Sequence, residues 1–174
     1  MSRIFGPIDQ VAWVVPDITA SMLYWAEKLG VGPWHVIERL RPTDFRVDGV
    51  SSAAEISLAF AYSGRLQLEL IQPHDDEPSM YKEAIDAGRA GAQHHVGFFR
   101  RDFDRRLEAA LDAGYEVGQS GSLGAIRFAY LRTDRDPGTI AELVELSDGV
   151  EASFVAFHRA ALEWDGSVPV RRVG

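Results

Sequence analysis

The chain has 174 residues, of which 46% are hydrophobic and 25% charged, and its formal net charge is −8. This length fits one compact domain or two small fused units. The acidic excess argues against nucleic-acid binding, which needs clustered Lys and Arg against phosphates. The absence of cysteine excludes disulfides, thiol nucleophiles and thiolate metal sites. The sequence shows neither the apolar core of a signal peptide nor an apolar run of roughly 18 residues, so we expect a cytoplasmic protein that does not enter a membrane.

The first repeat unit runs over about residues 6–73. Its segment IDQVAWVVPDITASMLYWAEKLG predicts a short strand and then an amphipathic helix that begins after Asp17 and ends at Gly30. Further along, the segments FAY and RLQLELIQ predict two strands, and Glu69 stands in the middle of the second.

The second repeat unit, about residues 91–147, follows the same order. The segment QHHVGFFRRDFDRRLEAALDAG predicts a strand, then a helix that begins after Asp102 and ends at Gly114. The segment FAY recurs, and TIAELVEL predicts a strand with Glu142 in its middle. Repeated order at several landmarks indicates two copies of one structural unit.

A short helix at about residues 78–88 links the two units, so residues 6–147 are expected to form a single domain. Each unit reads as a βαβββ module, which predicts an α+β fold. The acidic run HDDEP before the linker helix is interpreted as an exposed turn and helix start, because Pro and acidic residues favour the first helical turn.

Side-chain alternation along the strands separates a helix-facing side from an opposite face. Gln10 and His95 occupy matching positions on the opposite face, whereas His94 is expected on the helix side. Glu69 and Glu142 fall on the same face as Gln10 and His95. A buried carboxylate costs several kcal/mol unless it is paired, hydrogen-bonded or bound to a metal. The repeat therefore predicts that four polar side chains converge on one face of the sheet.

The stretches IDQVAWVVPDI, LQLELIQP, GAQHHVGFF and GTIAELVEL, in this order, resemble the vicinal oxygen chelate (VOC) superfamily. This superfamily includes glyoxalase I, extradiol dioxygenases, fosfomycin and bleomycin resistance proteins, and methylmalonyl-CoA epimerase. The resemblance covers roughly residues 6–147 and is greatest to the epimerase-type, glyoxalase-like branch. It implies two βαβββ modules that form a U-shaped, eight-stranded cleft around a divalent metal ion.

The resemblance implies that the metal ligands are Gln10, Glu69, His95 and Glu142. Gln10 stands where the family commonly has a histidine. With one imidazole, two carboxylates and an amide oxygen, the set would suit Mg, Mn, Co, Ni, Zn or Fe(II). The set also leaves open a cleft that has lost its metal. It differs from the two-histidine, one-carboxylate triad of non-haem iron oxygenases, which disfavours a ring-cleaving dioxygenase.

In the family, the metal stabilises negative charge on a substrate with adjacent oxygens while a proton moves at the carbon next to a carbonyl. The resemblance therefore implies an isomerase, epimerase or lyase that acts on an acyl-CoA or an α-hydroxycarbonyl, with Glu142 or Glu69 as the base. Epimerases use a further glutamate from the third-strand region. Here Ala53 or Ala54 aligns near that position with Glu55 close by, so this role is left unassigned.

Six apolar or aromatic residues on the strands are predicted to contact a small-molecule substrate, and a bulky or flat molecule would fit. They are Val14, Phe60, Tyr62, Phe99, Phe128 and Tyr130. The second functional hypothesis is a metal-free protein that binds a hydrophobic small molecule in the same cleft. A dioxygenase is the third.

Residues 148–174 are expected to form a helical extension and a tail. Phe154, Phe157, Ala161 and Trp164 share one face of an amphipathic segment. This face would cover the protein's own cleft or pack on a second subunit. The last residues, 168–174, read as a frayed or partner-docked end. The resemblance implies a homodimer.

Overall fold

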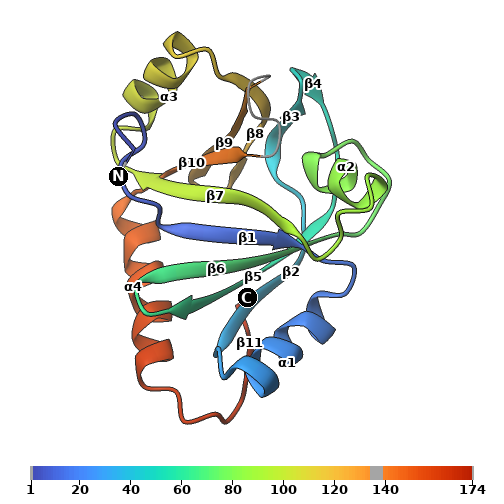
Figure 1. The fold of residues 1–174 in the computed structure, drawn as a ribbon, viewed down its shortest axis with the longest axis vertical. Helices are drawn as coiled ribbons and strands as arrows, with labels where there is room; N and C mark the ends of the chain where they lie inside the picture. Colours follow the sequence, from blue (N-terminus) through green and yellow to red (C-terminus); the bar gives the residue numbers. More distant parts are fainter. Residues whose placement is uncertain (1, 134–138, 174) are drawn as a thin grey trace.

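The computed structural model describes residues 2–133 and 139–173, and its strands form one mixed sheet (Figure 1). Eleven strands lie in these described ranges, in the order β11-β2-β5-β6-β1-β7-β10-β9-β8-β3-β4. Four helices lie in the same ranges. The predicted α+β fold with a C-terminal helix is confirmed. Three of the strands, β3, β4 and β11, come in addition to the eight that were expected.

The eight expected strands come from two units of the same βαβββ order. The first consists of β1 (Gln10–Val14), α1 (Ile18–Leu29), β2 (Trp34–Leu40), β5 (Ile56–Ser63) and β6 (Leu66–Pro73). The second consists of β7 (Gln93–Arg100), α3 (Phe103–Asp112), β8 (Glu116–Leu123), β9 (Ile126–Arg132) and β10 (Ile140–Glu145). The units meet in the middle of the sheet, where β1 pairs antiparallel with β7.

The other elements connect or extend these units. They are the hairpin of β3 (Thr43–Val47) and β4 (Val50–Ser51), the linker helix α2 (Met80–Asp86), the C-terminal helix α4 (Asp148–Leu162) and β11 (Val170–Arg172). None of the helices in the described ranges has both the length and the apolar composition to cross a membrane.

The module helices begin at the predicted aspartates, but only one aspartate acts as a cap. The Asp17 side chain accepts a hydrogen bond from the Ala20 N–H at 2.9 Å, which satisfies a free donor of the first turn of α1. Asp102 makes no such bond and instead forms ion pairs with Arg105 and Arg106. Both helices begin directly after their aspartates, and α1 ends at Leu29, before Gly30, as predicted. Helix α3 ends at Asp112, two residues before the predicted Gly114.

Strand pairing confirms that Gln10 and His95 occupy equivalent positions. Ala12 lies beside Glu69 in the neighbouring parallel strand, and Gly97 lies beside Glu142 in the same way. Ala12 and Gly97 are therefore equivalent, and Gln10 and His95 each stand two residues before them. The four predicted polar residues lie on one face because the strand pairs β1–β6 and β7–β10 have the same register.

The two FAY segments are not structurally equivalent, although their letters are identical. Phe60 pairs with Glu69, whereas the residue that pairs with Glu142 is Tyr130. Phe60 therefore matches Tyr130, and the two segments are offset by two residues. The identical letters do not mark equivalent positions, so FAY is not a valid landmark of the repeat.

The sheet bends back on itself. The chain passes directly from β2, near one end of the strand order, to β3, near the other end. β2 ends at Leu40, and Thr43 already pairs with Ser122 of β8, near the opposite end of the strand order. Three residues span at most roughly 10 Å. The two ends of the sheet must approach each other there, and the bend gives the sheet a concave face.

Apolar residues pack on both faces, as side-chain alternation predicted. On the convex side, Leu68 and Leu70 pack under α1 with Met22, and a separate cluster packs under α3. Ile71, on the same strand, faces the opposite way into a cluster with Val14. The helices thus cover the convex face and leave the concave face for the site.

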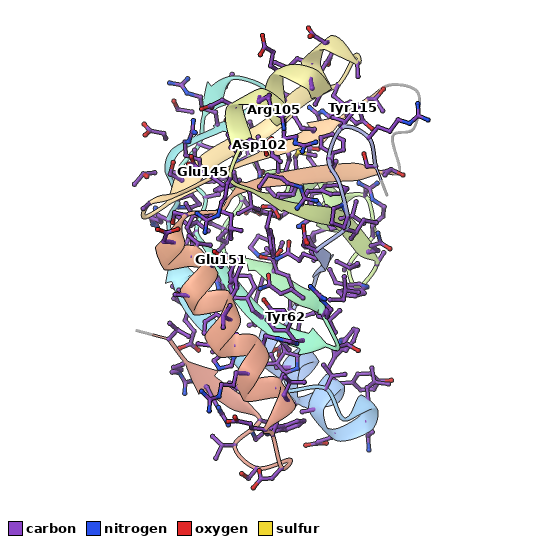
Figure 2. All side chains as sticks on the ribbon, turned by 90° about the vertical axis from the view of Figure 1, so that its left-hand side faces the viewer. Tyr62, Asp102, Arg105, Tyr115, Glu145 and Glu151 are labelled. Atoms are coloured by element: carbon purple, nitrogen blue, oxygen red, sulfur yellow. The ribbon has the colours of Figure 1, made fainter. Side chains whose placement is uncertain are left out.

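The C-terminal extension covers the chain's own concave face. Helix α4 packs against β5 and crosses the sheet with Tyr62 on the strand beside it (Figure 2). Beyond the helix, the Trp34 N–H donates to the Pro169 carbonyl at 2.8 Å, and β11 pairs parallel with β2. The expected frayed end is therefore wrong for residues 168–173, while Gly174 lies outside the described residues.

Candidate functional site

Four strands in the middle of the sheet bring the predicted polar residues together. Gln10 comes from β1, Glu69 from β6, His95 from β7 and Glu142 from β10. All four side chains are buried, with exposures between 1% and 6%. Burial of this many polar groups requires that they satisfy one another or a bound ion.

His95 Nε2 is the centre of this polar cluster. It lies 3.2 Å from Glu142 Oε2 and 3.3 Å from both Glu69 Oε2 and Gln10 Oε1. All three neighbours are acceptor atoms. A single N–H can align well with one of them, and within the described residues Glu69 Oε2 has no hydrogen-bond partner.

The backbone carbonyl of Met80 fixes which nitrogens of His94 and His95 carry hydrogen. His94 Nε2 lies 3.2 Å from the Met80 carbonyl oxygen, which only accepts, so this nitrogen donates. Burial lowers the pKa of His94 to about 3 and keeps its ring neutral, so its Nδ1 accepts a hydrogen bond. The Nδ1 atoms of the two histidines lie 3.0 Å apart, and His95 Nδ1 is therefore the donor. His95 Nε2 is left to present its lone pair, or a second proton, to the three oxygens.

His94 lies beside His95, on the side of the polar cluster. Alternation had predicted the opposite side, which the module helices α1 and α3 cover. The pairing of β1 with β7 shifts register between Ala12 and Trp13, which breaks the strict alternation at this strand entrance. His94 packs under the linker helix against the Tyr81 ring at 5.5 Å.

A chain of amides orients Gln10. Its Nε2 donates to Gln67 Oε1 at 2.7 Å, and Gln67 Nε2 in turn donates to the Tyr62 hydroxyl oxygen at 2.8 Å. The amide nitrogen of Gln10 is thereby turned away from His95, and its oxygen is turned toward the cluster. Partners of this kind set the direction of a metal ligand.

The carboxylates and the imidazole shift each other's protonation. Burial alone would lower the pKa of His95, but the facing Glu142 and Glu69 raise that pKa to about 9. Burial raises the pKa of Glu69 to about 7, and the nearby Glu142 charge adds to this rise, although His95 opposes it. Without a bound cation, a proton is therefore retained in the cluster at neutral pH.

The polar cluster fits a divalent ion. The ligand atoms of Glu69, His95 and Glu142 all lie within 4.8 Å of one another. Metal–ligand bonds of about 2.0–2.2 Å place neighbouring ligand atoms about 3–3.5 Å apart, which matches the separations of 3.2 and 3.3 Å around His95 Nε2. The unpartnered Glu69 Oε2 is the atom that an ion would satisfy. These residues form a possible metal site whose preferred ion is not fixed by the geometry.

A cavity of about 390 Å³ opens beside the polar cluster. Gln10, Glu69 and Glu142 line it, while His95 lies behind them. The rest of its wall is mainly apolar and includes Phe60, Phe99, Phe128, Tyr130, Phe154 and Phe157.

Four of the six predicted substrate-contacting residues line this cavity, and two do not. Phe60, Phe99, Phe128 and Tyr130 are part of the wall. Val14 is fully buried in the core cluster beneath it. Tyr62 holds the Gln67 amide and packs against His158 of α4.

Sequence reasoning missed Tyr81 of the linker helix as a cavity residue. Its hydroxyl donates to the Tyr130 hydroxyl at 2.9 Å, and burial raises the pKa of both tyrosines well above the usual value. Strand alternation contains no information about where a linker helix packs. The sequence therefore gave no signal for this residue.

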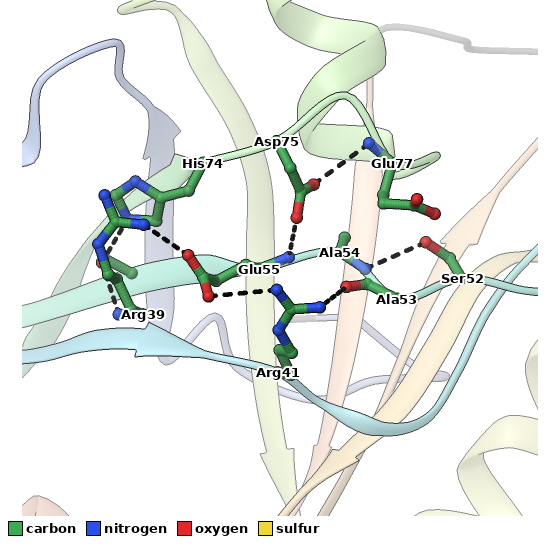
Figure 3. Close-up of polar contacts among 10 residues, drawn as sticks. Arg39, Arg41, Ser52, Ala53, Ala54, Glu55, His74, Asp75 and Glu77 are labelled. Atoms are coloured by element: carbon green, nitrogen blue, oxygen red, sulfur yellow. Dashed lines mark hydrogen bonds and ion pairs between the residues drawn. The ribbon is translucent and has the colours of Figure 1, made fainter.

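Glu55, the acidic residue near the third-strand position of epimerases, lies outside the cavity wall. It forms ion pairs with Arg39 at 2.6 Å and Arg41 at 3.4 Å, and its backbone N–H donates to Asp75 (Figure 3). The Arg39 side chain lowers the pKa of the Glu55 carboxyl. Glu55 is therefore a surface ion-pair residue and does not face the polar cluster.

Gly97 leaves the space that Gln10 fills, and we expect Gly97→Ala to displace the Gln10 side chain. A Cβ at Gly97 would stand 2.6 Å from Gln10 Oε1 and 2.9 Å from Gln10 Cβ. Because Gln10 Cβ is fixed to the backbone, a rotamer change cannot relieve the contact, and overpacking of this kind costs about 1–3 kcal/mol. Chemical denaturation of the variant should show this loss, together with weaker binding of a divalent ion.

Gly149→Ala is the matched control, since nothing lies within 4 Å of a Cβ built there and the residue is in the first turn of α4. It should leave ion binding unchanged and keep or slightly raise stability. Equal losses in both variants would contradict the steric explanation.

The comparisons with known proteins agree with this fold. The sequence model of the Glyoxalase/Bleomycin resistance protein/Dioxygenase superfamily matches residues 9–130. The chain therefore belongs to this superfamily, the VOC superfamily. A search of curated proteins found no match.

Solved structures share the fold at low sequence identity. Methylmalonyl-CoA epimerase from Mycobacterium tuberculosis is 17% identical with a TM-score of 0.63, and the match covers 87% of this chain and 95% of that one. A variant of Streptomyces coelicolor methylmalonyl-CoA epimerase in complex with 2-nitronate-propionyl-CoA is 20% identical with a TM-score of 0.56, over 81% and 94% of the two chains. A hypothetical protein from Bacillus halodurans C-125 is 17% identical with a TM-score of 0.59, over 82% and 95%.

Proposed function

We propose that this chain is a metal-dependent enzyme that moves a proton at a carbon next to a carbonyl, as an isomerase, epimerase or lyase. The observation that carries the proposal is the convergence of three oxygens on His95 Nε2, with Glu69 Oε2 left without a hydrogen-bond partner among the described residues. Membership of the VOC superfamily supports the same chemistry.

Gln10, Glu69, His95 and Glu142 are the residues proposed to hold the ion. When bound, the ion supplies a Lewis acid that stabilises negative charge on a substrate oxygen. The amide chain through Gln67 keeps the Gln10 oxygen directed at this point, and His94 keeps the His95 tautomer fixed.

Glu69 and Glu142 are the candidate bases because both are buried and line the cavity. A carboxylate in contact with the substrate takes the proton from the carbon next to the carbonyl and returns it to the same or a neighbouring atom.

Tyr130 is the proposed hydrogen-bond donor to the substrate. Its raised pKa keeps it protonated, and it accepts the hydrogen bond from Tyr81, so its own hydrogen is free to point into the cavity. A fixed donor at this position would stabilise charge that develops on a substrate oxygen.

The test begins with elemental analysis of protein purified without a chelator, followed by titration with Mn²⁺, Co²⁺, Ni²⁺, Zn²⁺ and Fe²⁺. Carbonyl compounds, including acyl-CoA thioesters and α-hydroxyketones, are then incubated in D₂O and examined by NMR. We expect a stoichiometric ion and deuterium exchange at the carbon next to the carbonyl, with exchange lost in Glu142→Gln or Glu69→Gln. A protein that binds none of these ions would contradict the proposal.

The second candidate function is a metal-free protein that binds a small molecule. It is favoured by one observation, because a protonated His95 between two carboxylates satisfies much of the cluster's charge without an ion. Such a protein would purify without metal and bind apolar compounds in the cavity. A ring-cleaving dioxygenase is the third candidate, but only one imidazole of the described residues faces the cluster, against the two of the iron triad.

We also propose that residues 6–147 form the VOC domain and that 148–174 are an extension of it. A cytoplasmic location and a homodimer remain predictions from the sequence and the resemblance. Size-exclusion chromatography with light scattering would measure the oligomeric state directly.

A further inference from the structure

We propose that the substrate of this site carries its adjacent oxygens on a flat, uncharged, apolar body of one or two rings, and that helix α4 selects it. This inference rests on the proposed function. It adds the class of substrate, and it assigns α4 as the element that determines it.

The first argument is the distribution of polarity around the cavity. Polar groups gather at the buried cluster and the two tyrosines, and Arg41 and Ser153 are the other polar side chains in the wall. Apart from Gly124, the other lining residues are aliphatic or aromatic. A cavity of about 150 Å³ is enough for a benzene ring, so the 390 Å³ here admits two rings with room for the oxygens.

The second argument is the orientation of the aromatic rings. The ring of Phe157 is stacked on His35 with centroids 4.1 Å apart and an interplanar angle of 15°, and it lies at 16° to the ring of Phe60. Phe154 is tilted against Phe99, with ring centroids 4.8 Å apart and an interplanar angle of 35°. The nearly parallel rings of Phe60 and Phe157 favour a flat guest that stacks in the same direction.

The third argument is charge away from the ion site. The cation of the wall, Arg41, is already bound to Glu55 and to the Ala53 carbonyl. A substrate carboxylate carried on the part of the molecule that does not contact the ion would have no free cation to pair with among the described lining residues. The site thus disfavours a substrate with a carboxylate on that part.

The fourth argument is that α4 is a fixed part of the wall. Arg101 pairs with Asp148 at 2.7 Å and with Glu151 in the first turn, and β11 ties the far end to β2. The family match ends at residue 130, so α4 lies outside the matched residues. Phe154 and Phe157 of α4 complete a wall whose other aromatic rings lie within the match.

Hydroxamic acids test the inference without turnover. Each has two adjacent oxygens, and the group attached to them can be varied from methyl to naphthyl. Acetohydroxamic, benzohydroxamic, 2-naphthohydroxamic and 4-carboxybenzohydroxamic acid are titrated calorimetrically into protein loaded with the ion that it binds. We expect the naphthyl compound to bind at least tenfold more tightly than the acetyl compound. The added carboxylate should weaken binding of the phenyl compound at least tenfold. Equal affinities, or tighter binding of the carboxylated probe, would overturn the inference.

Variants of α4 assign the selectivity to its aromatic face. Phe157→Ala, and Phe157→Leu as a conservative substitution that keeps the core apolar, should reduce the naphthyl-over-acetyl preference at least fivefold while acetohydroxamic acid binds as before. Val155→Ala and Leu162→Ala are matched controls, because these residues are 60% and 71% exposed on the same helix. An unchanged preference in both Phe157 variants would contradict the role of α4.

A neutral aryl ketone separates this inference from the proposed metal function. Ion-free protein is titrated with 2-acetonaphthone, and binding is followed by ligand-observed NMR. If the protein binds no ion but binds the ketone, and Phe157→Ala weakens that binding, the apolar pocket stands and the metal-dependent function fails. If the ion binds and neither the ketone nor the naphthyl hydroxamate is preferred, the function stands and the substrate class is wrong.

Discussion

His95→Ala is expected to weaken the binding of a divalent ion by at least about 100-fold, because loss of even an outer partner of a ligand costs about 10–100-fold. His95 Nε2 is the atom on which the other three ligand oxygens converge. Isothermal titration with Mn²⁺ or Co²⁺ measures the effect, and circular dichroism establishes that the variant is folded.

His74→Ala is the matched control for this experiment. His74 lies with Asp75 and Asp76 around a separate surface depression, away from the buried cluster. If ion binding is lost in the His74 variant and kept in the His95 variant, the ion occupies the surface acidic run and the proposed centre is wrong.

The second large effect is the pH dependence of stability, which should have opposite signs with and without the ion. In ion-free protein the carboxylates raise the pKa of His95 from 6.5 to about 9, so its contribution is full below about 6.5 and lost as the pH rises through 9. A shift of this size corresponds to about 3 kcal/mol.

Glu69 acts in the same direction, although it is an acid. Burial raises the pKa of Glu69 from 4.5 to about 7, so the folded state binds its proton more tightly than the unfolded state does. Its contribution is present below about 4.5 and lost as the pH rises through 7. The lowered pKa of His94 acts in the opposite direction below about pH 6.5, where it offsets Glu69. The ion-free protein should therefore become less stable mainly between pH 7 and pH 9, by on the order of a few kcal/mol.

The ion-loaded protein should become more stable over the same range, since metal ligands must be deprotonated and affinity rises with pH. Urea denaturation at a series of pH values, with chelator or with excess ion, measures both slopes. Glu69→Gln should remove the Glu69 contribution, so that the stability of the ion-free variant rises with pH below about 6.5. Parallel slopes in the two conditions would show that the ion does not bind to this cluster.

Much of the candidate site was predictable because strands obey a two-residue period. That period, together with the internal repeat, placed Gln10, Glu69, His95 and Glu142 on one face, and the observed pairing registers agree. The prediction of His94 failed where the register shifts between β1 and β7, since a sequence contains no mark of such an irregularity.

The parts of the site that come from outside the repeat could not be predicted in this way. Tyr81 reaches the cavity from a linker helix, and the sequence left open whether Phe154 and Phe157 covered their own cleft or a second subunit. Amphipathicity shows that a helix buries one face, but it does not specify what the face is buried against.

The sequence by itself determined the two βαβββ modules, the faces of most strand residues and the identity of the four converging polar residues. These features follow from local periodicity and from the internal repeat, both of which can be read directly from the order of residues. Only the tertiary structure decided that β3 closes the bent sheet, that β11 completes its edge and that α4 forms the cavity wall. Those outcomes depend on contacts between residues distant in sequence, and the free energy of burying a face is the same whichever apolar partner covers it.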